Sequence, residues 1–345
     1  MTARARPQDA AIATTQRWLL AAVTLLDLLS FYLFIGDAYE TARTRGGAVG
    51  LLAAVLAEPL FRAGLALAGA VAAIAFALRG SIWPAIVAIV ALALLSAEQA
   101  QLFGSPWRHL FFSGVCLTGW IAGAWVGRGS SAYARTGAVA LLAAAYCSSG
   151  ISKVAIGGSE WFSGLPIQAV ILGQVGLIDD TILAAYRSWV VTTPGAASFF
   201  AVATLLFEVG APLMVMARKL RRPIALGLMA MHLNILLLTD ILYWESMVLL
   251  AVFGLAPVEP DESEEVGGLL LHRRFHLAVA ILTVLAGLAV WNQARRVPER
   301  AAASGNSLRP ALPALTGACP YHDNRAMRSG RVDLATLLGA GSGKS

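Results

Sequence analysis

Lys153 is the residue whose type and position most directly suggest chemistry. It lies near the end of an apolar segment, whereas the other two lysines, Lys219 and Lys344, stand among polar residues. An ammonium group in or near hydrocarbon costs about 2.5 kcal/mol or more, so an ionisable residue at such a place is a functional-site hypothesis by default. Lysine, unlike arginine, can lose its proton when it is buried. Lys153 is therefore a candidate general base.

The neighbours of Lys153 are spaced so that they share its face of a helix. Tyr146, Ser149, Gly150 and Lys153 stand at offsets 0, 3, 4 and 7 along the segment. The small residues beside the lysine leave room for a ligand or a neighbouring helix. We expect the helix to end near Gly157, so the alternative is that the lysine reaches past the helix end to water.

Two further titratable residues are expected at a similar depth in the membrane. Glu98 lies in the outer half of a predicted helix over Ile82–Phe103, and His109 precedes the next apolar run. Titratable groups that converge in a low-dielectric site can be tuned for acid–base catalysis. We therefore predict Lys153, His109 and Glu98 as catalytic residues. The alternative is that Glu98 only offsets the charge of Lys153 or Arg108.

Three other polar residues lie inside apolar runs. Glu208 and His232 stand near the middle of two later predicted helices, and Asp27 stands in the first one. Each is expensive to bury, and Glu208, Asp27 and His232 together suggest a proton path, as in a proton-coupled transporter. A lone helical histidine is more often a hydrogen-bonding partner between helices, so that interpretation of His232 stays open.

No metal site is predicted. His272 and His276 have helical spacing but lie beside arginines at a predicted membrane boundary, where a cation would be repelled. The three cysteines, Cys116, Cys147 and Cys319, have no CxxC spacing. No nucleophile triad or dinucleotide motif occurs either, so any chemistry is expected to be acid–base work on a lipophilic substrate.

The composition indicates the elements that must position these residues. Hydrophobic residues make up 58% of the chain and charged residues only 13%, whereas soluble domains are roughly 45–50% apolar. We predict an all-α fold, a polytopic membrane helical bundle with about eight transmembrane helices and some interfacial or re-entrant segments. The predicted spans are Trp18–Ile35, Leu60–Leu78, Ile82–Phe103, Leu110–Val126, Gly137–Ala155, Ala197–Ala217, Pro223–Leu255 and His276–Trp291. Of these, 223–255 is too long for one ordinary span and contains two acidic residues, so we expect a broken crossing.

The basic residues predict the orientation of the chain. They gather in short loops at the ends of apolar runs, most densely at 218–222, so the positive-inside rule explains the net charge of +6 without a nucleic-acid partner. We predict a multi-pass protein of the cell membrane with residues 1–16 as a cytoplasmic tail and 17–296 as the transmembrane domain. Residues 297–345, rich in Pro, Gly, Ala and Arg, are expected to form a mobile cytoplasmic tail.

The segment around Lys153 resembles a known motif. Tyr146-x-x-x-Gly150-x-x-Lys153, followed by Trp161-x-x-Gly164, is similar to the central motif of vitamin K-dependent γ-glutamyl carboxylase and its bacterial relatives, the horizontally transferred transmembrane domain (HTTM) proteins. Met231-His232-Leu-Asn234 with the apolar stretch after Tyr243, and Asp27 in the first helix, resemble further parts of that family. The resemblance covers roughly residues 18–256.

The resemblance implies a cofactor and site roles. It implies that Lys153 is the base that deprotonates a reduced quinone, such as menaquinone or a vitamin K-like molecule. It also implies that substrate is bound by the remaining motif residues, which are Tyr146, Gly150, Trp161, Gly164 and His232. The large extramembrane region of the carboxylase has no counterpart here, so peptide γ-carboxylation is not expected.

Three functions follow as hypotheses. The first is a membrane enzyme that performs acid–base or redox chemistry on a quinol or another lipophilic substrate with Lys153 as base, resembling a quinol-dependent carboxylase or oxygenase. The second is a non-catalytic membrane module that assists maturation of a peptide or toxin, as in the sporulation-delaying protein B type of relative, or that binds a small partner protein. The third is the proton-coupled transporter. All three imply contact with membrane lipids.

Overall fold

The structure, a computed structural model, describes residues 7–33, 55, 58–103, 112–174, 182–193, 195–239 and 241–256. Within these ranges the regular structure is helical and contains no strand, which confirms the all-α fold class. The chain divides into two compact units. Unit 1 comprises Met1–Tyr146, Ala211–Leu226 and Trp244–Ala286, and unit 2 comprises Cys147–Gly210, Gly227–Tyr243 and Gly287–Ser345.

The described helices indicate a membrane-embedded protein. Four of them are long and apolar enough to cross a membrane, and a bent helix pair raises the number to five. Three further apolar helices are shorter, so the described residues do not by themselves reach the predicted eight crossings. The predicted span His276–Trp291 lies outside the described residues. The four long candidates are Ile12–Tyr32, Pro59–Arg79, Ser131–Val154 and Arg221–Thr239.

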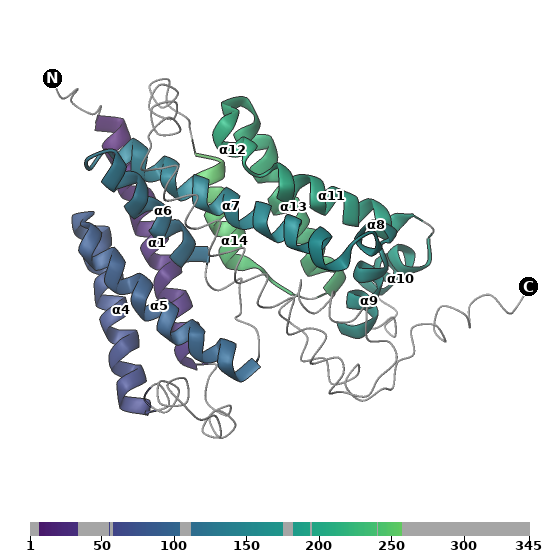
Figure 1. The fold of residues 1–345 in the computed structure, drawn as a ribbon, viewed down its shortest axis with the longest axis horizontal. Coiled ribbons are helices and arrows are strands. Elements are labelled where there is room, and N and C mark those ends of the chain that lie inside the picture. Colours follow the sequence, from purple (N-terminus) through teal and green to yellow (C-terminus); the bar gives the residue numbers. More distant parts are fainter. Residues whose placement is uncertain are drawn as a thin grey trace, which may run out of the picture. The chain divides into compact units, whose positions relative to one another are not determined.

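The helices of unit 1 begin and end where the sequence provides the usual signals. Helix α1 spans Pro7–Leu33 and therefore begins before the apolar run predicted from Trp18. Helix α4, Pro59–Arg79, starts with proline in its first turn and ends at a left-handed Gly80, whose N–H bonds to the Phe76 carbonyl. Helix α1 packs against α4 and against α5, Ile82–Phe103, as the purple and blue ribbons of Figure 1 show.

Two glycines bring the next pair of helices in unit 1 into backbone contact. Helix α6 spans Phe112–Val126, and α7 spans Ser131–Gly157 and belongs to unit 1 as far as Tyr146. A Cβ atom on Gly119 would lie 2.2 Å from the Gly137 carbonyl oxygen, so neither helix could approach as closely with a side chain there. Such small-residue contacts are typical of packed membrane helices.

The predicted run 223–255 is interrupted, as expected. Helix α13 spans Arg221–Thr239, the residues Ile241–Tyr243 are non-helical, and α14 begins at Trp244 and ends at Leu249. A π-helical turn, Leu250–Gly254, continues from α14. In unit 1, α14 packs against α1 and α6.

Among the described residues, unit 2 contains the end of α7, three short helices between 160 and 192, the helix that follows them and α13 from Gly227 onward. The three short helices are α8, Glu160–Ser163, α9, Leu165–Gln174, and α10, Ile182–Thr192. Helix α11, Ala196–Gly210, packs against all three and is bent by 90° from α10. A small apolar core holds α9, α10, α11 and α13 together through Ile171, Val190, Val191, Ala197 and Leu238.

Candidate functional site

Gly150 allows α7 and α11 to approach closely in unit 2. A Cβ atom at this position would lie 2.9 Å from Val209 Cγ2 and 3.0 Å from Glu208 Cβ. Real Cβ atoms essentially never come as close as 2.9 Å, so a side chain at this position would force Val209 or the two helices to shift. One turn further along α7, this approach places Lys153 opposite Glu208.

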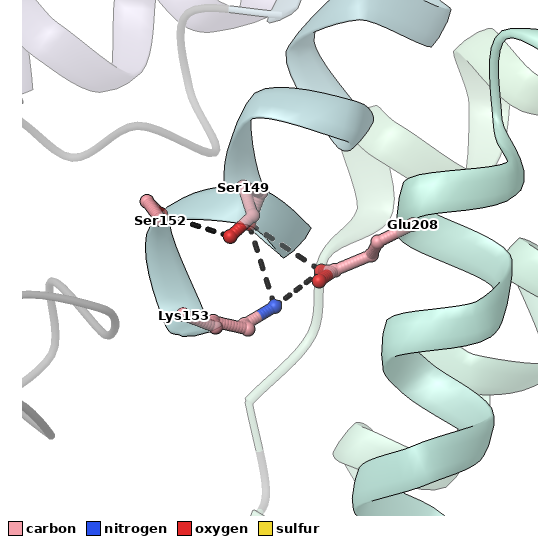
Figure 2. A network of polar contacts seen from close by, with 4 residues as sticks. All are labelled: Ser149, Ser152, Lys153 and Glu208. Atoms are coloured by element: carbon pink, nitrogen blue, oxygen red, sulfur yellow. Dashed lines mark hydrogen bonds and ion pairs between the residues drawn. The ribbon is translucent and has the colours of Figure 1, made fainter. Parts of the chain in front are cut away.

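Lys153 and Glu208 form a buried ion pair, which Figure 2 shows. The ammonium group donates a hydrogen bond to Glu208 Oε1, and the relative exposures of the two side chains are 12% and 4%. Ser149 lies beside both: its Oγ is 3.4 Å from Lys153 Nζ and 3.4 Å from Glu208 Oε1. Ser152 donates to the Ser149 carbonyl at 2.8 Å. The pair therefore links α7 to α11 through charge and hydrogen bonds.

The indole of Trp161 adds a further contact to the lysine. Trp161 lies in α8 and is buried, and Lys153 Nζ lies 5.6 Å from the centroid of its ring. A cation at this distance is attracted to the negative face of an aromatic ring, and the attraction grows when water is excluded. The ammonium group is thus stabilised from two sides, by a carboxylate and by an aromatic face.

Two polar atoms at this site have unused hydrogen-bonding capacity. Glu208 Oε2 and Trp161 Nε1 are buried, and neither has a hydrogen-bond partner among the described residues. Buried polar atoms are nearly always hydrogen-bonded, so each such atom requires an explanation. A carboxylate oxygen accepts a hydrogen and an indole N–H donates one. A ligand with a hydroxyl group and an oxygen acceptor could satisfy both.

His232 belongs to the same unit and lies near the pair. It is buried in α13, and its ring centroid is 5.0 Å from that of Tyr243. The positive charge of Lys153 lies close enough to act on the His232 ring. Two hydrogen bonds join α10 to this part of α13. The Tyr186 hydroxyl donates to Asn234 Oδ1 at 2.6 Å, and Arg187 Nε donates to the Leu237 carbonyl at 3.0 Å.

The structure brings together only part of the predicted site. Of the predicted residues, Lys153, Gly150, Trp161 and Glu208 meet in unit 2. Gly164 lies in the same unit and ends α8 in a left-handed conformation with φ 79°, where a Cβ atom would lie 2.4 Å from Ser198 N. Gly164 thus allows a tight turn that lies close to the backbone of α11, and its predicted role in substrate binding stays a prediction.

Of the other predicted catalytic and binding residues, one packs in unit 1 and two have side chains outside the described part of the chain. Tyr146 belongs to unit 1, where its ring packs on Phe112 at 5.3 Å between centroids. Glu98 lies in α5, but its side chain is outside the described residues, as is the whole of His109. Their catalytic roles stay predictions.

Sequence reasoning missed the pairing of Lys153 with Glu208. It considered Glu98 as the partner of the lysine and placed Glu208 deeper in the membrane. The signal was present, because a buried carboxylate needs a cation and an apolar chain with few charges offers few choices. What the sequence lacked was the distance between α7 and α11, which depends on the packing at Gly150.

Asp27 lies in unit 1 and contacts Ser113, a residue that the sequence did not single out. Ser113 donates from its hydroxyl to Asp27 and from its backbone N–H to Glu245 of α14. Asp27 belongs to unit 1, whereas Glu208 and His232 belong to unit 2, so the proton path through these three residues stays a prediction. The described part of the chain contains no group of three or more His, Cys, Asp or Glu residues that could hold a metal ion.

The site thus consists of an ion pair, an aromatic face and two unsatisfied buried atoms in unit 2. Such an arrangement is chemically suited to proton transfer, because a carboxylate oxygen without a partner among the described residues lies beside an ammonium group. None of the protein-family models, curated proteins or solved structures compared with this chain matches it.

Proposed function

We propose that the Lys153–Glu208 pair is the acid–base site of a membrane-embedded enzyme that acts on a lipophilic weak acid. One observation carries the proposal: a buried carboxylate paired with lysine keeps a second oxygen, Oε2, without a partner among the described residues. A purely structural ion pair is expected to satisfy the remaining lone pairs of its carboxylate. An open acceptor beside a cation favours a ligand hydroxyl at this point.

In the proposed step the substrate hydroxyl gives its proton to Glu208 Oε2. The substrate O–H bond breaks, a carboxylic acid forms on Glu208, and the electron pair stays on the substrate oxygen. Lys153 stabilises this oxygen, because a preorganised positive charge is most effective where water is excluded. The sequence predicts Lys153 as the base. Because the lysine ammonium donates to Glu208 and Ser149, we instead assign the proton acceptor to Glu208 and keep Lys153 as its charged partner.

A reduced quinone fits this site chemically. Glu208 Oε2 could accept a hydrogen from its hydroxyl, and Trp161 offers both an aromatic face and an N–H donor without a partner among the described residues. When bound, such a molecule would supply an ionisable hydroxyl group on an aromatic ring. The resemblance of the motif around Lys153 to the carboxylase and HTTM proteins supports the same class of molecule and stays a prediction.

The test uses a lipophilic naphthol, because its ring resembles that of menaquinol and its absorption differs between the neutral and ionised forms. The probe is titrated into purified protein in detergent, at a pH where the free probe is neutral. We expect the wild type to bind it in the ionised form. Lys153→Met should bind it in the neutral form, since no positive charge then stabilises the naphtholate oxygen. Glu208→Gln can hold the naphtholate beside Lys153 only by releasing the proton to the solvent, which a pH indicator detects, whereas the wild type keeps this proton on Glu208.

The matched control is the double variant Lys153→Met/Glu208→Gln, which removes both charges and roughly keeps the side-chain volumes. It should remain folded by circular dichroism and leave the naphthol neutral. Binding of the neutral naphthol by the wild type, or no binding by a folded wild type, would overturn the proposal.

The ion pair also favours a second candidate, a non-catalytic module that assists a peptide or a small partner protein. In this case the pair only joins α7 to α11, so positive charge alone should suffice. Lys153→Arg would then keep the thermal stability of the wild type, and naphthol would stay neutral with both proteins.

The third candidate is a proton-coupled transporter that uses Glu208, His232 and Asp27. It requires substrate-dependent proton movement in vesicles, and Glu208→Gln should abolish this movement.

The proposed enzyme is a protein of about eight crossings with both termini on the cytoplasmic side. The long apolar helices, α11, two of the shorter apolar helices and the apolar run 276–291 support this number. The basic residues at 218–222 support the orientation.

A further inference from the structure

A second cluster of titratable groups lies in unit 1 and takes no part in the proposed function. Asp27 of α1, Ser113 of α6 and Glu245 of α14 are fully or almost fully buried, with relative exposures of 0%, 0% and 1%. Each residue comes from a different helix, and the three helices pack against one another. The cluster therefore joins α1, α6 and α14.

Ser113 donates to both carboxyl groups. Its hydroxyl donates to Asp27 Oδ2, and its backbone N–H donates to Glu245 Oε1. The backbone N–H of Phe112 also bonds to Glu245. These donors occupy one oxygen of each acid, and both donors of Ser113 are then used.

The second oxygen of each acid lacks a donor in the part of the chain that the structure describes. Asp27 Oδ1 and Glu245 Oε2 are buried, and neither has a hydrogen-bond partner among the described residues. The two carboxyl groups nevertheless lie within side-chain hydrogen-bonding reach of each other. The groups that act on the two acids are Ser113, Phe112 and the acids themselves, and none of these carries a positive charge.

Two buried carboxylates held this close do not both ionise unless a cation offsets their charges, because the charges repel. A proton between them removes one charge and supplies the missing donor, so that a carboxylic acid donates to a carboxylate. We propose that Asp27 and Glu245 together bind one proton at neutral pH and form a protonation site in unit 1 that is separate from the Lys153–Glu208 pair.

Among the described residues, no group of three or more His, Cys, Asp or Glu residues around the pair could hold a metal ion. From α6, Ser113 presents a donor to the pair, and the thiol of Cys116 lies near both acids. Beyond the pair, α1 is joined to the π-helical turn after α14 by Gln16, which donates to the Val252 carbonyl at 2.9 Å. Glu245 is the one titratable residue of α14, whereas α1 carries Asp9, Arg17 and Tyr32 besides Asp27.

Loss of the proton would place two negative charges side by side between α1 and α14. Their repulsion would act directly on the contact that Ser113 bridges. The site therefore makes the packing of α14 against α1 and α6 depend on pH, with the packing favoured while the proton is bound.

The proton is detectable by infrared spectroscopy on the purified protein in lipid nanodiscs. A neutral carboxylic acid has a carbonyl band that a carboxylate lacks, and we expect the wild type to show this band at neutral pH. Asp27→Asn and Glu245→Gln should each remove it, because the new amide donates to the remaining carboxylate and no proton is needed. Glu58→Gln, at an exposed glutamate, is the matched control and should leave the band unchanged.

Wild-type stability gives a second measurement that needs no variant. The folded chain holds one proton that the unfolded chain releases at neutral pH, so raising the pH favours unfolding. We expect the folding equilibrium constant to fall about tenfold per pH unit from this one proton. A missing carbonyl band in the wild type, or a band that survives both amide variants, would overturn the proposal. Stability that rises with sodium concentration, but does not rise when the pH is lowered, would also overturn the proposal and would identify a cation site.

Discussion

At the scale of single residues, the central finding is that the most unusual lysine of the chain has a buried carboxylate as its partner. The Lys153 side chain does not have to extend to water, because Glu208 and Trp161 stabilise its positive charge inside the protein. The same contacts leave Glu208 Oε2 and Trp161 Nε1 open among the described residues. The pair is thus both a link between two helices and a candidate proton-transfer site.

The energetic coupling of the pair can be measured. Lys153→Met leaves a buried carboxylate without a cation, and Glu208→Gln leaves a buried ammonium without an anion, so each change should destabilise the protein by about 3–5 kcal/mol. The double variant Lys153→Met/Glu208→Gln should cost much less than the sum, because no charge is left alone. Denaturation of the four proteins in the same detergent gives the coupling energy. Additive losses would show that the two side chains do not interact.

Trp161 provides a separate test of the ligand. Trp161→Phe keeps an aromatic ring beside Lys153 but removes the indole N–H, which has no partner among the described residues. We expect little change in the pairing of Lys153 with Glu208. Naphthol binding should weaken by about 1 kcal/mol, or roughly fivefold, if the N–H donates to the bound molecule. Equal affinities of the two proteins would remove Trp161 from the binding site.

At the scale of helices, the site depends on the close approach of α7 and α11. Gly150→Ala would place a Cβ atom 2.9 Å from Val209 Cγ2 and 3.0 Å from Glu208 Cβ. We expect a loss of about 1–3 kcal/mol in stability, as for other overpacked positions, together with a weaker Lys153–Glu208 coupling in the double-variant cycle.

The matched control for Gly150→Ala is Gly64→Ala in α4. No atom lies within 4 Å of a Cβ built on Gly64, and alanine is the better helix former by about 1 kcal/mol. This change should leave the protein as stable as the wild type or more stable. Equal effects of the two substitutions would mean that the approach of α7 to α11 is not tight.

At the scale of the whole molecule, the membrane topology can be tested through α7. Its candidate span, Ser131–Val154, separates Ser130 from Ser159, so single cysteines at these positions should lie on opposite sides of the membrane. In a background without Cys116, Cys147 and Cys319, we expect a membrane-impermeant maleimide added to intact cells to label Ser159→Cys. Ser130→Cys should be labelled only after the membrane is permeabilised, because arginines at 128 and 135 predict that this end of α7 lies on the cytoplasmic side.

Labelling of both positions from outside would show that α7 does not cross. Labelling of Ser130→Cys alone would reverse the orientation. A cysteine in place of Ser149, next to the buried pair, is the control and should react with the maleimide only after denaturation.

The sequence alone determined the class of the protein and the residues that deserve testing. Its apolar composition predicts membrane helices because hydrocarbon accepts few other structures. The break after α13 and the prominence of Lys153, Glu208, Asp27 and His232 followed from the cost of burying polar groups. These are local properties, so they can be recognised without knowing which helices are neighbours.

Only the tertiary structure decided which of these residues meet. Lys153 contacts Glu208 because the missing side chain at Gly150 lets α7 approach α11, and Asp27 contacts Glu245 through Ser113 because α1, α6 and α14 pack together. Both pairings join residues far apart in the chain. Apolar patterning shows that a helix has a buried face but not which helix covers it, so the partner of each buried charge depended on three-dimensional packing.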